Sequence, residues 1–253
     1  MKIAVCIKQV PTREWQPRVN EAGTWVREAD ASFELNEPDA YALEEALRLR
    51  ETHGGEVVVC AAGPGRLQQV FREALARGAD RAVHVEGDGL TAADPSVTSA
   101  ALAAAMADEA FDLVLTGLQS DDQGHGQTGV MLAERLGMPH STIIMEVEVT
   151  DGRLRVKREL EGGWFQWVGM PLPALLTIQS GINQLRYATL KGIMSAKRKE
   201  IRKVSPPAGL AASQVILGLA VPTRSKQTRM LDGPPGEAAV ELVRLLREEA
   251  RVL

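Results

Sequence analysis

The feature that most constrains this 253-residue chain is a regular alternation of short apolar runs with helical patterns in its first half. Apolar runs typical of buried strands occupy residues 2–10, 56–63, 81–87 and 111–117. The spacing between them predicts helices over residues 36–53, 66–78, 94–110 and 127–137. Because no hairpin turns separate these elements, the alternation implies a parallel sheet covered by helices on both faces. We therefore predict an α/β fold with a doubly wound, mainly parallel sheet.

Two of the predicted helices begin with favourable start signals. Asn36 is a good N-cap residue, and Pro38 fits the first helical turn behind it. Asp94 and Pro95 repeat this arrangement at the start of the third helix. Both cap side chains are therefore expected to accept hydrogen bonds from the first free amides of their helices.

The pattern changes after about residue 140. Residues 142–160 are typical of two strands joined by Asp151-Gly152, a favoured hairpin turn. Residues 173–178 have the apolar character of another buried strand. The second half is therefore expected to combine a hairpin with a further buried strand.

The last fifty residues have a different character. Residues 204–233 show weak periodicity, and such a long irregular segment is not expected to float free in a compact domain. Residues 237–253 have the pattern of an amphipathic helix. We therefore predict a nucleotide-binding domain over 1–203, and an extended arm with a C-terminal helix over 204–253 that pack on a partner chain.

Bulk composition narrows the functional classes. The formal net charge of -4 argues against a dedicated nucleic-acid-binding protein, which would normally be basic. Cys6 and Cys60 lie in apolar runs without metal-ligand spacing, so we expect buried, reduced thiols. No signal peptide is apparent, and no apolar run approaches the roughly 20 residues of a membrane-spanning helix. The sequence therefore predicts a cytoplasmic protein with no nucleic-acid partner and no direct membrane insertion.

One short stretch concentrates side chains with functional potential. GLQSDDQGHGQTG, residues 117–129, follows the fourth predicted strand and leads into the fourth predicted helix. Ligands of parallel sheets bind at such positions, outside the carboxyl ends of the strands. Its glycines let the backbone approach a ligand, and the amides of Gln127, Thr128 and Gly129 would be free donors at a helix N-terminus, which favours an anion. The stretch is therefore a candidate phosphate cradle, although it lacks the ending of a P-loop.

Other interpretations of this stretch compete with phosphate binding. A metal site would use Asp121, Asp122 and His125, but this composition is common on surfaces. A catalytic His125 would need a nucleophile and an orienting partner, and the sequence nominates neither. A plain solvated turn with a helix cap is as good an interpretation of this stretch alone. The loops 36–39 and 61–64 should converge on the same sheet edge, which favours a nucleotide pocket.

Five stretches of the chain resemble one protein family. They are IAVCIKQVP, LNEPDAYALEEALRL, GLQSDDQGHGQTG, VKRELEGGWFQWVGMPLPALLT and RYATLKGIMSAKRKEI. The fourth is the most specific, because it matches the spacing of the family signature at Val156, Arg158, Glu161, Gly162, Gly163, Gln166, Val168, Pro173 and Thr177. From residue 1 to about 201 the chain resembles the beta subunit of electron transfer flavoproteins.

The resemblance implies a cofactor arrangement as well as a fold. Members have an adenine nucleotide alpha hydrolase-like fold and form a heterodimer, whose alpha subunit holds most of the contacts to a redox-active FAD. The beta subunit usually binds a structural AMP without hydrolysing it. The matching AMP contacts in this sequence are Cys6, Asn36, Glu37, Pro38, Asp39, Ala62, Gly117, Asp121, Asp122, Gln123, Gly124, His125, Gly126, Gln127 and Thr128. No catalytic residue and no metal ligand is implied, so an electron carrier subunit is expected rather than an enzyme.

The stretch RYATLKGIM resembles the family's docking loop for acyl-CoA and related flavin dehydrogenases. Its anchoring leucine corresponds to Leu190, with Ile193, Met194 and Lys197 beside it. The electrons would pass from the alpha-subunit FAD to a membrane quinone oxidoreductase, as in fatty acid oxidation. The basic residues at 197–203 would form a patch that steers an acidic partner, or else a solvated helix face.

Departures from the family pattern leave alternatives open. Arg13 stands where some members place a tyrosine near the flavin, and Trp15 is close to that position. One subfamily binds a second FAD in place of AMP and bifurcates electrons. An adenine-nucleotide-binding regulatory module of similar fold is an alternative of another class. An ATP-cleaving ligase is disfavoured, because residues 8–14 contain no pyrophosphate loop.

Overall fold

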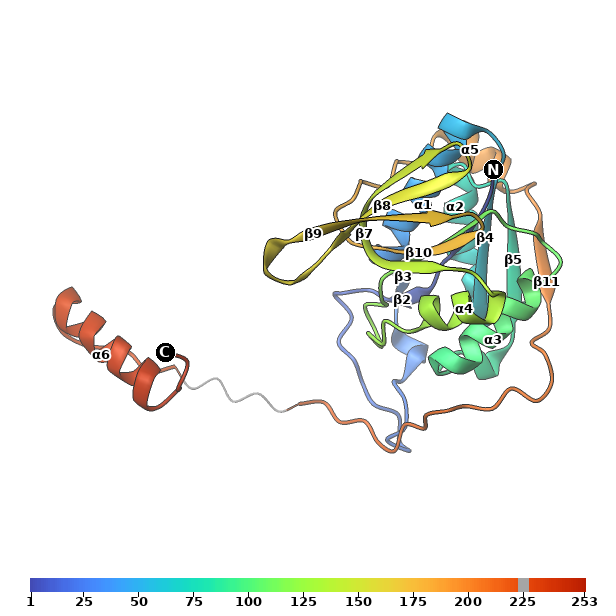
Figure 1. The fold of residues 1–253 in the computed structure, drawn as a ribbon. Coiled ribbons are helices and arrows are strands. Elements are labelled where there is room, and N and C mark those ends of the chain that lie inside the picture. The colour runs from blue at the N-terminus through green and yellow to red at the C-terminus, as the bar shows by residue number, and fades with distance from the viewer. Residues whose placement is uncertain (223–227) are drawn as a thin grey trace. The chain divides into compact units, whose positions relative to one another are not determined.

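The computed structural model describes residues 1–222 and 228–253 (Figure 1). Its helices are α1 Glu37–His53, α2 Gln68–Arg77, α3 Pro95–Met106, α4 Thr128–Leu136, α5 Leu190–Ala196 and α6 Pro235–Glu248. Its strands are β1 Lys2–Cys6, β2 Gln9–Pro11, β3 Phe33–Leu35, β4 Glu56–Gly63, β5 Arg81–Glu86, β6 Leu113–Gly117, β7 His140–Thr150, β8 Arg153–Glu159, β9 Phe165–Pro171, β10 Ala174–Ile178 and β11 Ile201–Val204. The helices predicted in the first half are therefore confirmed, with ends shifted by a few residues.

Nine of the strands form one sheet in the order β11-β5-β4-β1-β6-β10-β7-β8-β9. Neighbours from β11 to β7 pair in parallel, and only the pairs β7–β8 and β8–β9 are antiparallel. The chain winds outward from β1 through β4 to β5 and then returns to the other side of β1 with β6. This confirms the doubly wound α/β fold and places the reversal of winding between β1 and β6.

Alternate residues of the central strands face two separate cores. In β1, Ile3 and Val5 belong to the larger core with side chains of α1 and α2. Ala4 and Cys6 belong to the second core with side chains of α3 and α4. In Figure 1, α3 and α4 lie in front of the sheet, and α1 and α2 lie behind it. Burial on both faces explains why these strands are continuously apolar rather than alternating.

The structure differs from the sequence patterns at three places. The run 2–10 is not one strand, because the main-sheet strand ends at Cys6 and β2 pairs antiparallel with β3 instead. Strand β9 was not predicted at all; it is an edge strand whose aromatic side chains are largely exposed. The basic run 196–203 crosses from the end of α5 into β11, which pairs with β5. In each case pairing with another strand decides the outcome: β2 pairs with β3, β9 with the preceding β8, and β11 with the distant β5.

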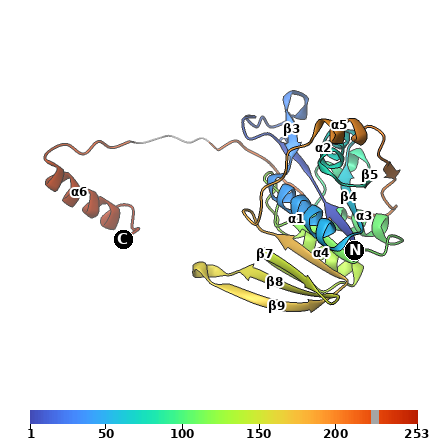
Figure 2. The same ribbon diagram turned by 90° about the horizontal axis from the view of Figure 1, so that it is seen from above.

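The predicted hairpin is confirmed. Asp151 and Gly152 connect β7 to β8 with φ values of 50° and 73°, which is the left-handed conformation that such tight turns require. With β9, the hairpin makes a three-stranded antiparallel extension of the parallel sheet, labelled together in Figure 2.

The C-terminal fifth of the chain is shared between two compact units. Residues Met1–Leu219 form one compact unit and Ala220–Leu253 form another. The first unit includes the start of the arm, where the amides of Ser213 and Gln214 donate to Asp94 Oδ2 over 2.5 and 2.9 Å. The second unit contains α6, which has no buried residue. The division at residue 203 and the packing on a partner chain stay predictions. No helix in the described part of the chain has the length and apolar character needed to cross a membrane.

Candidate functional site

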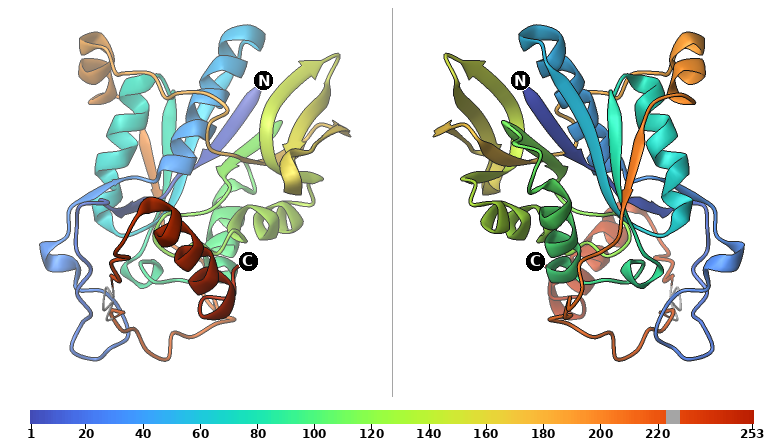
Figure 3. Two further views of the ribbon diagram at one scale, coloured as in Figure 1. Left: turned by 90° about the vertical axis from the view of Figure 1, so that its left-hand side faces the viewer. Right: turned by 90° about the vertical axis from the view of Figure 1, so that its right-hand side faces the viewer.

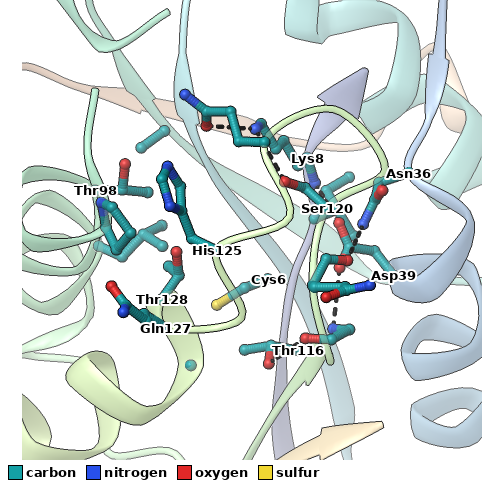
Figure 4. Close-up of a pocket in the computed structure, with 18 of the residues that line it drawn as sticks. Cys6, Lys8, Asn36, Asp39, Thr98, Thr116, Ser120, His125, Gln127 and Thr128 are labelled. Carbon is teal, nitrogen blue, oxygen red and sulfur yellow. Dashed lines mark hydrogen bonds between the residues drawn. The ribbon is translucent and has the colours of Figure 1, made fainter. Parts of the chain in front are cut away.

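A pocket lies at the carboxyl ends of β1, β4 and β6, beside the point where the winding reverses. It encloses about 780 Å³ of empty space including its open mouth. Figure 4 shows His125, Gln127 and Thr128 on one side and Asn36 with Asp39 on the other. Cys6 and Thr116 lie between these two groups.

Most of the residues predicted for the site meet in this pocket. Ten of them line it: Cys6, Asn36, Asp39, Ala62, Gly117, Gln123, His125, Gly126, Gln127 and Thr128. The other five do not line it, although they lie in the same loops: Glu37, Pro38, Asp121, Asp122 and Gly124. The three predicted loops therefore converge at one place, while part of each loop supports the wall rather than forming it.

The Asn36 side chain does not have the predicted capping role. No side-chain hydrogen bond caps the start of α1. Asn36 Nδ2 instead donates to the Gln119 carbonyl over 3.1 Å, and Asn36 Oδ1 accepts from the Asp121 amide over 2.9 Å. The side chain is buried and uses both of its polar atoms to hold the loop after β6. Asp94, by contrast, accepts from the Val97 amide over 2.8 Å, which confirms its predicted cap.

Asp39 fastens three elements together beneath the pocket. From the first turn of α1, its carboxylate accepts from the Lys8 amide after β1 over 2.7 Å and from the Gly117 amide of β6 over 3.0 Å. Burial raises the pKa of Asp39 to about 7, against the opposite effect of these amides and of the Lys8 charge. The carboxyl therefore sets the spacing of the strand ends that form the pocket floor.

Lys8 closes one side of the pocket, and the sequence analysis missed it. Its ammonium lies 2.6 Å from Asp122 Oδ1, 2.9 Å from Gln123 Oε1 and 3.3 Å from Ser120 Oγ. Burial acts to raise the pKa of Asp122, but the charge and hydrogen bond of Lys8 outweigh it and hold that pKa below its usual value. Asp122 is thus committed to this ion pair. For Lys8, the only signal in the sequence was a charged side chain directly after an apolar strand.

The start of α4 faces the pocket without a side-chain cap. Gly126 leads into it with φ of 62°, a left-handed conformation that glycine adopts without strain. A Cβ on Gly129 would lie 2.7 Å from Thr116 Oγ1 and 2.8 Å from Thr177 Cγ2, so the first turn sits close against the strand ends. Backbone donors and the helix dipole at this end suit an anionic group.

A further wall of the pocket comes from residues that the sequence analysis did not single out. Leu90, Thr91, Ala93, Pro95, Thr98 and Leu102 line it from the connection before α3 and from α3 itself. Most are apolar, so they supply surface against which a flat hydrophobic group can pack, and they form no recognisable sequence motif. No signal in the sequence distinguishes them from ordinary core residues.

The thiols in and near the pocket are poor nucleophiles. Burial raises the pKa of the Cys6 thiol well above its usual value, with the Cys60 and Asp39 charges acting in the same direction. Burial also raises the pKa of Cys60 to about 12. Both cysteines are free and buried. Cys6 therefore acts as a neutral wall residue.

The predicted docking residues form an exposed surface on α5 and the residue after it, which we call the docking surface: Leu190, Ile193, Met194 and Lys197. Leu190 is 83% exposed, Met194 71% and Ile193 46%, although all three are apolar. The Thr189 hydroxyl caps the helix by accepting from the Gly192 amide over 3.0 Å. Leu190 therefore does not belong to the core of this chain and is free to contact a partner.

The predicted basic patch is smaller than the sequence suggested. Arg202 lies 2.9 Å from Glu109, and Lys203 lies 2.8 Å from Glu86. Lys199 donates to the carbonyls of Leu75 and Ala79. These three cations are engaged by partners within the fold, although Lys203 stays exposed. Lys197 and Arg198 are the other exposed basic residues of the run.

Comparisons with known proteins agree on one family. Residues 24–208 match the electron transfer flavoprotein domain. The chain is 37% identical over 261 residues to the electron transfer flavoprotein subunit beta of Methylophilus methylotrophus, with 98% of each chain covered. It is 37% identical over 259 residues to the mitochondrial subunit beta of Oryza sativa subsp. japonica, covering 100% of both. Identity to the Bacillus subtilis subunit beta is 34% over 235 residues, covering 90% of this chain and 91% of that one.

Proposed function

This chain belongs to the electron transfer flavoprotein family as a beta subunit, and from that premise we propose that it binds AMP and docks flavin dehydrogenases. The family implies a flavin cofactor in a heterodimer with an alpha subunit. In the proposed function, the FAD held mainly by the alpha subunit accepts electrons from acyl-CoA and related dehydrogenases and passes them to a quinone oxidoreductase. The chain itself acts in the cytoplasm and catalyses no bond-making step.

The pocket after β1 and β6 supports the choice of AMP. Its apolar wall from Leu90 to Leu102 suits an adenine ring, and the uncapped start of α4 suits one phosphate group. Two carboxyls of the site are otherwise engaged, because Asp122 pairs with Lys8 and Asp39 bridges two strand ends. These commitments favour a static nucleotide over one that is cleaved.

Acid extraction of the purified heterodimer is expected to release AMP and FAD in equal amounts. Chromatography with mass detection identifies both. Two FAD molecules per heterodimer without AMP would favour the electron-bifurcating alternative, because FAD would then occupy this pocket. A folded heterodimer that releases FAD but no adenine mononucleotide would contradict the site assignment.

The docking surface supports a partner of apolar character. Monomeric proteins rarely leave several large apolar side chains exposed together on one short helix. Leu190 and Met194 are well separated from the pocket in sequence and are not among its lining residues. A single aliphatic anchor with weaker neighbours is a common arrangement of binding hot spots. We therefore assign dehydrogenase docking to this surface.

We assign the arm and α6 as the segments that contact the alpha subunit. Val215, Leu217 and Val221 are exposed along the arm, and Val240 and Val243 are exposed on α6. Exposed apolar side chains in two segments that follow each other in the sequence indicate that another chain covers them. The alpha subunit is the partner that the family supplies.

Replacing Val240 and Val243 together with aspartate is expected to weaken the heterodimer about tenfold or more, because two charges would have to be buried on association. Analytical ultracentrifugation of co-expressed subunits measures the dissociation constant. Arg244→Gln is the matched control, since Arg244 pairs with Glu241 and Glu248 on α6 itself. An unchanged dissociation constant in the double variant would contradict this assignment.

A further inference from the structure

The helix that carries the docking surface is held unusually close to α2. Figures 2 and 3 show α5 lying beside α2. Gly192, in the middle of α5, faces the Ala76 carbonyl, and a Cβ at this position would lie far inside contact distance of that oxygen. The approach therefore depends on glycine, and it places the two helices in direct backbone contact.

Two cations fasten the helices to each other in a reciprocal way. Arg72 of α2 donates through Nη1 to the carbonyl of Ala196, the last residue of α5, and to that of Lys199 in the turn beyond it, the second over 2.9 Å. Lys199 donates to the carbonyls of Leu75 and Ala79 at the end of α2, over 3.1 and 2.5 Å. The last carbonyls of a helix lack intrahelical donors, and a cation there is also favoured by the helix dipole. The C-terminal end of α5 is therefore capped from α2, and that of α2 from the turn that follows α5.

The segment before α5 is held as firmly. The Arg186 guanidinium lies 3.0 Å from both carboxylate oxygens of Glu44 on α1 and pairs with Glu51 as well. Burial acts to raise the pKa of Glu44, but Arg186 outweighs it and holds that pKa below its usual value, so the carboxylate stays charged. The docking surface thus projects from a short segment that is anchored at both sides.

We propose that Arg72 is a positioning residue for docking: by capping the end of α5, it holds Leu190 and Met194 in the orientation that a dehydrogenase meets. The inference rests on the proposed docking function. A surface that is already ordered binds more tightly, because each rotamer-rich side chain or loop that must be immobilised on association weakens binding. Arg72 touches neither the nucleotide pocket nor the exposed face of α5.

The test uses the complete heterodimer with FAD bound and an acyl-CoA dehydrogenase as the electron donor. Arg72→Met removes the guanidinium donors and keeps the aliphatic stem. The expected result is faster amide hydrogen exchange over residues 192–199 and a rise of about threefold to tenfold in KM for the dehydrogenase, with kcat and FAD content unchanged. Arg72→Lys is expected to recover part of both effects, because an ammonium can still donate to one of the two carbonyls.

Arg77→Met is the matched control, because Arg77 lies on the same helix and bonds to the carbonyl and the carboxylate of Glu73 within that helix. It is expected to change neither hydrogen exchange in α5 nor KM. A third variant, Leu190→Ala, distinguishes a failure of the positioning role from a failure of the docking assignment. If Leu190→Ala raises KM but Arg72→Met changes neither exchange nor KM, or changes exchange alone, the positioning role is wrong. If both leave KM unchanged, the docking assignment itself has failed, and the positioning inference fails with it.

Discussion

Gly117→Ala is expected to destabilise the subunit by about 3 kcal/mol and to remove its nucleotide. Gly117 is the last residue of β6, where a Cβ would lie 2.5 Å from Asp39 Oδ1 and 2.7 Å from the carbonyl carbon of Pro38. The Pro38 carbonyl carbon belongs to the backbone of α1, and the Asp39 carboxylate is held by the amides of Lys8 and Gly117, so neither can move aside easily. The added methyl would separate α1 from β6, lengthen the bond between Asp39 and the Gly117 amide, and distort the pocket floor.

Thermal unfolding of the heterodimer and the amount of extracted nucleotide measure this effect. Gly169→Ala is the matched control: Gly169 lies in β9, has no positive φ and has no atom within 4 Å of an added Cβ. The control is expected to stay within about 0.5 kcal/mol of the parent protein and to keep its nucleotide. A Gly117→Ala protein with the parent melting temperature and full nucleotide content would contradict the geometry assigned to the site.

Leu190→Ala is expected to raise KM for dehydrogenases about thirtyfold while leaving the fold intact. Truncating a hot-spot side chain weakens binding by about 2 kcal/mol or more, which corresponds to that factor. The fold should not respond, because Leu190 is 83% exposed and contributes little to the core. Flavin content and melting temperature are therefore expected to match the parent heterodimer.

Flavin reduction measured with several dehydrogenases tests the role of Leu190. Leu160→Ala is the control, since Leu160 is an exposed leucine, 40% accessible, that follows β8 outside the docking surface. Unchanged reduction kinetics with every dehydrogenase would show that Leu190 does not anchor these partners. A loss of flavin in Leu190→Ala would instead indicate a contact with the alpha subunit.

Local patterns predicted those parts of the molecule that depend on neighbours in sequence. The cap of Asp94 formed as predicted, because its partner amide is only three residues away. The Asp151-Gly152 turn formed for the same reason. The Asn36 side chain did not form its predicted cap, although asparagine favours the N-cap position as aspartate does. Its amide found better partners in the loop 119–121, which no local pattern could place beside it.

The pocket shows the same division. Strand–helix alternation was sufficient to predict that the loops after β1, β4 and β6 share an edge, because parallel strands bring their carboxyl ends together. The individual contacts were not predictable in this way. Lys8 and Asp122 are separated by 114 positions, and their ion pair exists only because β1 and β6 are adjacent in the sheet.

The alternation of strands and helices in the first half, the α/β class and the loop that forms the pocket followed from sequence patterns, and the family resemblance indicated the docking residues. Periodicity and turn preferences are properties of residues two to four positions apart, so a single chain displays them directly. Only the tertiary structure decided that residues 2–10 divide between two sheets, that Lys199, Arg202 and Lys203 are used inside the fold, and that Arg72 caps α5. These outcomes depend on which polar groups meet when distant segments pack, because buried carbonyls and charges must find partners wherever the fold supplies them.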